Sequence, residues 1–127
     1  MIYKKEPILI MWDMVKSLAT KIPIYKEAMS EDEDSTPQSY LLLRSEVTDG
    51  SSAFGDGVSL IREADCDFIF FTKGIATNST DKHNKNKADI TKALKDAGFA
   101  FKTYNIGYIE SLKSTQQTWS GKISYIS

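Results

Sequence analysis

The stretch EADCDFIFF (residues 63–71), in the middle of the 127-residue chain, decides the fold. Acidic and apolar residues alternate at its start with a period of two, as in a strand with one buried face and one wet face. We therefore expect a long strand over residues 58–72. Its apolar face is formed by Ala64, Cys66, Phe68 and Phe70, and its wet face by Glu63, Asp65 and Asp67.

On the N-terminal side, apolar spacing predicts a helix over residues 8–20, followed by strands over 22–27 and 39–47. Pro7 suits the first helical turn and Pro23 ends the segment. The helix is expected to bury one stripe of side chains: Ile8, Met11, Trp12, Val15, Leu18 and Ala19.

On the C-terminal side, the sequence predicts a second helix from residue 80 or 82 to residue 97 and then two strands, 99–109 and 116–126. Gly98 stands where a C-terminal helix cap is expected. The buried stripe of this helix is Ile90, Ala93, Leu94 and Ala97, and one face of the last strand is Trp119, Gly121, Ile123 and Tyr125.

The order α-β-β-β-α-β-β predicts an α+β fold, with two helices packed on one face of a mainly antiparallel sheet of about five strands. The length suits a single domain over residues 1–127. Residues 48–57 (TDGSSAFGDG) carry three glycines and two Asp-Gly pairs, which predicts a flexible hairpin loop.

The net charge of −1 excludes a protein that works by general attraction to nucleic acid or anionic lipid. The charge is nevertheless uneven, because residues 31–67 hold ten acidic and two basic residues, whereas residues 73–102 hold seven lysines and three aspartates. This pattern fits either two solvated faces or a subunit whose acidic side meets the basic side of a neighbour.

The sequence offers no constellation for catalysis or metal binding. The single histidine, His83, stands among lysines at a predicted helix start, and the single cysteine, Cys66, lies on a predicted apolar face. Zinc, calcium and phosphate-loop patterns are absent, so we expect no enzyme activity, cofactor or metal. One cysteine allows no internal disulfide, and without a signal peptide or membrane span we expect synthesis in the cytoplasm.

The stretch GFAFKTY (residues 98–104) resembles the aromatic strand of RNA-recognition domains, where exposed rings stack on bases. Ala97 and Lys102 stand where that motif has a basic residue and a valine. Aromatic residues that share a strand face more often belong to a core. An RNA-binding module that uses Phe99, Phe101 and Tyr104 therefore stands as the alternative from a different functional class.

Along most of its length, the chain resembles the tail-completion (tail-terminator) proteins of long-tailed bacteriophages. An acidic, proline-containing loop and a glycine-rich hairpin belong to this resemblance, together with five phrases: KIPIYKEAM (21–29), PQSYLLLRSEV (37–47), READCDFIFFTKG (62–74), ALKDAGFAF (93–101) and QTWSGKISYI (117–126).

The resemblance implies a structural protein of the virion, assembled in the host cytoplasm, that forms a ring, commonly a hexamer, on the tail tube. Its partners would be other copies of itself, the tail-tube protein and a head connector or stopper protein, while DNA passes through the lumen without specific binding. The role of a stopper or adaptor in the same junction is an alternative. The interface candidates are Glu31, Asp32, Glu33, Asp34, Asp49, Gly50, Gly55, Asp56 and Gly57.

Overall fold

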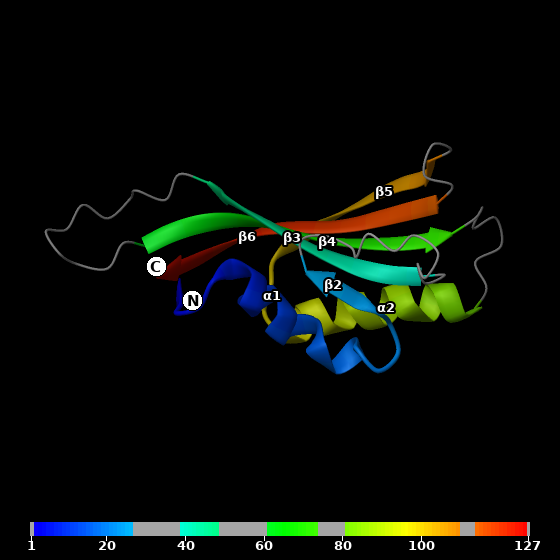
Figure 1. The fold of residues 1–127 in the computed structure, drawn as a ribbon, viewed down its shortest axis with the longest axis horizontal. Helices are drawn as coiled ribbons and strands as arrows, with labels where there is room; N and C mark the ends of the chain where they lie inside the picture. The colour runs from blue at the N-terminus through cyan, green and yellow to red at the C-terminus, as the bar shows by residue number, and fades with distance from the viewer. Residues whose placement is uncertain (1, 27–38, 49–60, 74–80, 110–113, 127) are drawn as a thin grey trace, which may run out of the picture.

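The longest strand pair forms the centre of the structure, a computed structural model that describes residues 2–26, 39–48, 61–73, 81–109 and 114–126. β4 (Ile61–Lys73) pairs antiparallel with β6 (Ser114–Ile126) without a register break along all thirteen residues of each strand. β3 (Ser39–Thr48) pairs antiparallel with the other edge of β4. These three strands span the long axis of the molecule (Figure 1).

Three shorter strands complete the sheet. β2 (Ile24–Lys26) runs parallel to the outer edge of β3, and β1 (Ile2–Tyr3) runs parallel to β6. β5 (Phe101–Ile109) pairs antiparallel with β6. Because β4 occupies one whole edge of β6, β5 and β1 must share the other edge, one after the other. The order is β1-β6-β4-β3-β2, with β5 also beside β6.

The fold is α+β, as the sequence predicts, and the described strands form one mixed sheet of six. The sheet is mainly antiparallel, as expected, because β3, β4, β6 and β5 pair antiparallel; the two short parallel pairings, of β1 and β2, were not expected. Between β2 and β3 lie the twelve residues 27–38, which is enough chain to return to the starting end of the sheet and enter a parallel strand. β1 has only two residues, which is too short for any periodic signal.

Both helices lie on the same side of the sheet (Figure 1). α1 (Pro7–Val15) continues into a 3-10 turn, η1 (Lys16–Leu18), and α2 is Asp81–Asp96. Met11, Val15 and Leu18 are buried as predicted, whereas Ala19 is exposed. Ile10 and Met14 are buried as well, on the same helical face as Met11 and Val15, whereas Ile8 and Trp12 are only partly buried against the core.

Gly98 caps α2 as predicted. Its φ is +77°, a left-handed value that favours glycine. The Gly98 N–H donates to the carbonyl of Lys95, and the Phe99 N–H donates to the carbonyl of Leu94, both at 3.0 Å. This pair of hydrogen bonds defines the Schellman motif. The buried side chains of Phe99 and Leu94 supply the apolar contact that usually accompanies it.

The core fills the space between the helices and the inward face of the sheet. Ala64, Cys66, Phe68 and Phe70 of β4 are all buried, which confirms the period-two prediction. Trp119 of β6 is fully buried, and its indole Nε1–H donates to the Thr91 hydroxyl of α2 at 3.1 Å. This hydrogen bond satisfies the one polar atom of the indole and fixes α2 against the central strand pair.

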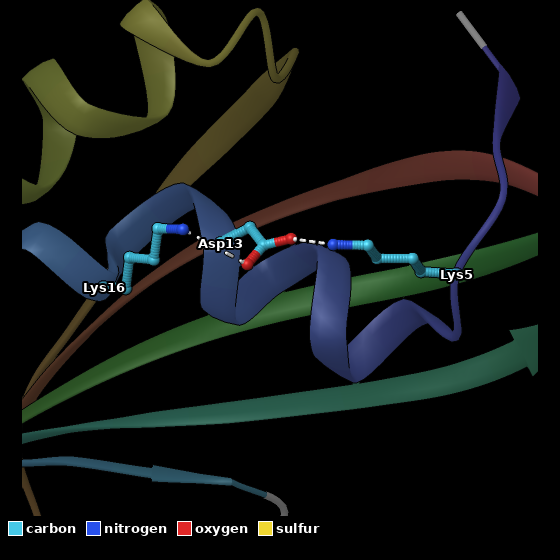
Figure 2. Close-up of polar contacts among 3 residues, drawn as sticks. All are labelled: Lys5, Asp13 and Lys16. Carbon is cyan, nitrogen blue, oxygen red and sulfur yellow. Dashed lines mark hydrogen bonds and ion pairs between the residues drawn. The ribbon is translucent and has the colours of Figure 1, made fainter.

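The segment between β1 and α1 is attached to the helix by charge. Lys5 Nζ lies 2.9 Å from Asp13 Oδ2, and Lys16 Nζ lies 3.7 Å from Asp13 Oδ1 (Figure 2). The hydrogen bond from Lys5, reinforced by the charges of both lysines, lowers the pKa of Asp13 below its ordinary value. All three side chains are largely exposed, so these ion pairs orient the segment more than they stabilise the fold.

Gly121 supplies the first test of this packing. A Cβ at Gly121 would collide with the carbonyl oxygen of Ala100 and lie 2.6 Å from Cζ of Phe99. We expect Gly121→Ala to lower the free energy of unfolding by about 2–3 kcal/mol, because the chain entering β5 would have to move away from β6. Urea denaturation followed by circular dichroism measures this change.

Gly98→Ala is the matched control. Nothing lies within 4 Å of a Cβ at Gly98, so its cost is only the unfavourable positive φ, about 1 kcal/mol. A loss at Gly121 no larger than the loss at Gly98 would contradict the close approach of β6 and the segment before β5.

Candidate functional site

The interface residues predicted from the sequence all fall outside the described residues. Glu31, Asp32, Glu33 and Asp34 lie in the segment 27–38, and Asp49, Gly50, Gly55, Asp56 and Gly57 lie in the segment 49–60. β3 and β4 are antiparallel neighbours, as a hairpin around residues 48–57 requires. The candidate surface is therefore built from the described strands that flank these two segments.

The sheet face opposite the helices, which we call the open face, carries a charged cluster at one end. The Ser120 hydroxyl donates to Asp67 Oδ1 at 2.6 Å, and Arg44 Nη2 lies 3.6 Å from Asp67 Oδ2. Lys122 Nζ lies 4.0 Å from Asp65 Oδ1. A shallow depression of about 600 Å³ spans this cluster from Glu46 on β3 to β5.

Aromatic and apolar side chains occupy the other end of the open face. The rings of Tyr40 and Phe71 are stacked with centroids 4.7 Å apart, and Tyr25 of β2 meets Tyr40 edge to face at 5.7 Å. Ile69 and Thr118 are buried between this group and the charged cluster. Partial burial raises the pKa of the Tyr40 phenol above its ordinary value. The open face thus changes from charged to apolar along the strands.

The acidic strand residues and the lysines of α2 lie on opposite sides of the sheet. The acidic strand residues Glu46, Asp65 and Asp67 lie on the open face, whereas the α2 lysines lie in the helix layer. Arg44, Lys102 and Lys122 come between the acidic residues on the open face and offset much of their charge. The sequence could not reveal this compensation, because these neighbours come from strands far apart along the chain.

No cysteine or histidine side chain is exposed among those described, and the Asp67 carboxylate beside the Ser120 hydroxyl is engaged by Arg44. Cys66 is fully buried, and desolvation, with smaller contributions from Asp67 and Asp65, raises its pKa to about 12. The side chain of His83 falls outside the described part of α2. Within the described ranges, no three His, Cys, Asp or Glu side chains are grouped to hold a metal ion. None of the helices described is long and apolar enough to cross a membrane.

The three rings of the RNA-binding alternative do not form an exposed platform. Phe99 lies in the core, where it contacts Phe68 edge to face at 5.4 Å. Phe101 is partly buried against the same core, and Tyr104 alone is well exposed. A base could therefore stack on at most one of the three rings without rearrangement of the fold.

The two outer edges of the sheet form a feature that the sequence analysis missed. β2 covers only Leu41–Leu43 of β3, so among the described strands nothing pairs with the outer edge of residues 44–48. β5 pairs with β6 on one side and with no described strand on the other. Val47 (50% exposed) and Tyr104 (51% exposed) lie on these two edges. A sequence signal for these edges was available: the charged residues Arg44, Glu46 and Lys102 stand close to Val47 and Tyr104 in the two strands.

Comparison with known proteins adds no relative: no family model, curated protein or solved structure matches this chain.

The position of Cys66 predicts its reactivity. We expect the thiol to react with a soluble disulfide reagent at pH 8 only as fast as the protein unfolds, and to react fully in urea, because the native fold excludes the reagent. Absorbance of the released thiolate measures the rate. Rapid reaction of the native protein would contradict the buried environment.

The raised pKa also predicts a pH dependence. The native state holds the thiol proton up to about pH 12, whereas the unfolded chain releases it near the ordinary thiol pKa of about 8.5. The free energy of unfolding is therefore unaffected by this group below about pH 8.5 and falls as the pH rises further. Cys66→Ala should reduce the alkaline slope of the unfolding free energy. An identical slope in the variant would contradict the shift.

Proposed function

We propose that this chain is a structural assembly protein of the head–tail junction of a long-tailed bacteriophage, where a ring of copies caps the tail tube and docks the DNA-filled head. The resemblance of its sequence phrases to tail-completion proteins suggests the role. The observation that carries the proposal is the pair of different, unpaired sheet edges at β3 and β5 in the described part of the chain.

A ring requires two different surfaces on each subunit, since each copy must contact its neighbours head to tail. The edge at β3 and the edge at β5 are two such surfaces, and each displays an exposed apolar side chain, Val47 or Tyr104. Long unpaired edges of this kind are a liability in a monomer and an advantage in a subunit. They favour assembly over chemistry at a pocket.

The charge distribution supports the same proposal. The helix layer carries the exposed lysines Lys85, Lys92 and Lys95, and the open face carries carboxylates interleaved with Arg44, Lys102 and Lys122. A face rich in lysine and a face of mixed charge let a ring present different surfaces to the tail and to the head.

The direct test mixes the protein with tail tubes assembled from the tail-tube protein of a long-tailed phage. Native mass spectrometry should find one oligomer whose mass is a whole-number multiple of 14.3 kDa. Electron microscopy should show added density on one end of each tube. Binding to the head connector without binding to tubes would favour the stopper or adaptor role. Salt-sensitive binding of single-stranded RNA at micromolar protein, without either association, would favour the RNA-binding alternative.

Charge reversal gives a prediction for the acidic segment. Replacing Glu31, Asp32, Glu33 and Asp34 by lysine should weaken docking about tenfold or more at low salt and leave the melting temperature within a few degrees, because an attractive surface becomes repulsive. Sedimentation of the protein with tubes measures docking.

Asp96→Lys is the control, since its side chain is exposed and belongs to the helix layer. This variant should dock like the parent protein. Equal docking by the fourfold reversal and the parent protein would remove charge complementarity from the proposal.

A further inference from the structure

We propose that copies of this chain join edge to edge: residues 44–47 of β3 in one copy pair antiparallel with residues 101–104 of β5 in the next, and the sheet continues across the boundary. This inference rests on the proposed function for the closure of the ring, but the pairing itself follows from the two edges. The partner is a second copy of this chain.

Strand direction is the first argument. β3, β4, β6 and β5 are neighbours in that order, and every step between them is antiparallel. β3 and β5 therefore run in opposite directions. A second copy in a similar orientation presents its β5 antiparallel to β3, the same relation that joins the long strands within one copy. Repetition of this contact is head to tail, as a ring requires.

The backbone of β3 offers hydrogen-bonding groups at the required positions. The Leu41 N–H donates to the Pro23 carbonyl at 2.8 Å, so the amide of Leu41 points to the outer edge. Backbone groups alternate sides along a strand, and the register with β4 is unbroken. Ser45 and Val47 therefore direct their N–H and C=O groups outward, where no described strand receives them.

The same alternation, followed across the sheet, identifies the outward groups of β5. The backbone N–H and C=O of Leu43 point away from β4. Those of its opposite residue, Phe68, therefore point toward β6 and bond to the backbone of Trp119. The backbone groups of Trp119 then point away from β5, so its opposite residue, Thr103, must direct its own backbone groups outward. Phe101, two positions earlier, does the same. Each edge thus offers two outward residues.

One register satisfies the backbone and the side chains together. With Ser45 opposite Thr103 and Val47 opposite Phe101, all four outward residues form hydrogen-bonded pairs. On the open face, Glu46 then meets Lys102, and Arg44 meets the exposed ring of Tyr104. This register produces four contacts that are favourable across strands: an ion pair, a cation on an aromatic ring, a hydroxyl pair and an apolar pair.

Other registers lose these matches. A shift of one residue opposes outward backbone groups to inward ones and exchanges the two faces. A shift of two residues either places Arg44 opposite Lys102, which repel, or places Glu46 opposite Tyr104, which removes the ion pair. Val47 and Tyr104, two of the three large apolar side chains most exposed in the described structure, are covered in the proposed register.

Engineered disulfides test the register. Glu46 and Lys102 would form a non-hydrogen-bonded pair with Cα atoms about 4.5 Å apart, within reach of a disulfide. The same two positions within one copy lie three strand spacings apart, about 14 Å, so a link can form only between copies. E46C/K102C should give a ladder of cross-linked oligomers under mild oxidation, and the buried Cys66 does not interfere.

The matched control is Glu46→Cys with Tyr104→Cys, a diagonal pair about 7–8 Å apart in the proposed register. It should cross-link at least tenfold more slowly. Faster linking of the control than of E46C/K102C would overturn the register.

Charge exchange provides a second measurement. Glu46→Lys or Lys102→Glu alone should raise the dissociation constant between subunits roughly tenfold at low salt, and the double exchange should restore it to within about threefold. Lys92→Glu, an exposed change on α2, should have no effect. Failure of the double exchange to recover association would overturn the pairing of Glu46 with Lys102.

Tail tubes and cross-links, measured on the same samples, separate the two proposals. Tube-capping rings without the 46–102 link would overturn the edge pairing and leave the proposed function standing. Linked oligomers that ignore tubes would support the pairing and overturn the function. Absence of both association and links would overturn both.

Discussion

The uninterrupted pairing of β4 with β6 is the constraint on which the rest of the structure depends. It provides the edge of β4 on which β3 is placed and the edge of β6 that β5 and β1 share. Trp119, on β6, carries the hydrogen bond that fixes α2 over the inward face. Because thirteen consecutive pairs allow no local slip, every other element has a defined position relative to this pair.

The two faces of the sheet differ in what they contact. The inward face places its apolar side chains in the core, including Phe68, Trp119 and the buried thiol of Cys66. The open face and the edges retain charge, aromatic rings and backbone groups without described partners. This organisation, with its contact surfaces at the edges and on the open face, supports the proposal of an assembly protein.

Local physics made much of the fold predictable. The period-two pattern of β4 placed Ala64, Cys66, Phe68 and Phe70 in the core, and the helix pattern ending in glycine located the cap at Gly98. The parallel placement of β2 was not predictable, because strand direction depends on the path of a twelve-residue connection. The burial of Ile10 and Met14, with Ile8 and Trp12 only partly buried, depends on how α1 is rotated against the sheet, which the apolar spacing alone does not fix. Pairs such as Asp65 with Lys122 join distant strands, so the charged cluster emerged only from the sheet register.

The most direct test of the central claim, that the sheet edges are where copies meet, is residue-resolved amide hydrogen exchange of the free and the assembled protein. Assembly should slow exchange at Ser45, Val47, Phe101 and Thr103, whose amides point outward. The amides of Lys102 and Tyr104 already point toward β6 and should change little. Slower exchange at these outward amides on both edges would support the account. Assembly that leaves them unprotected, and protects residues of the helix layer instead, would contradict it.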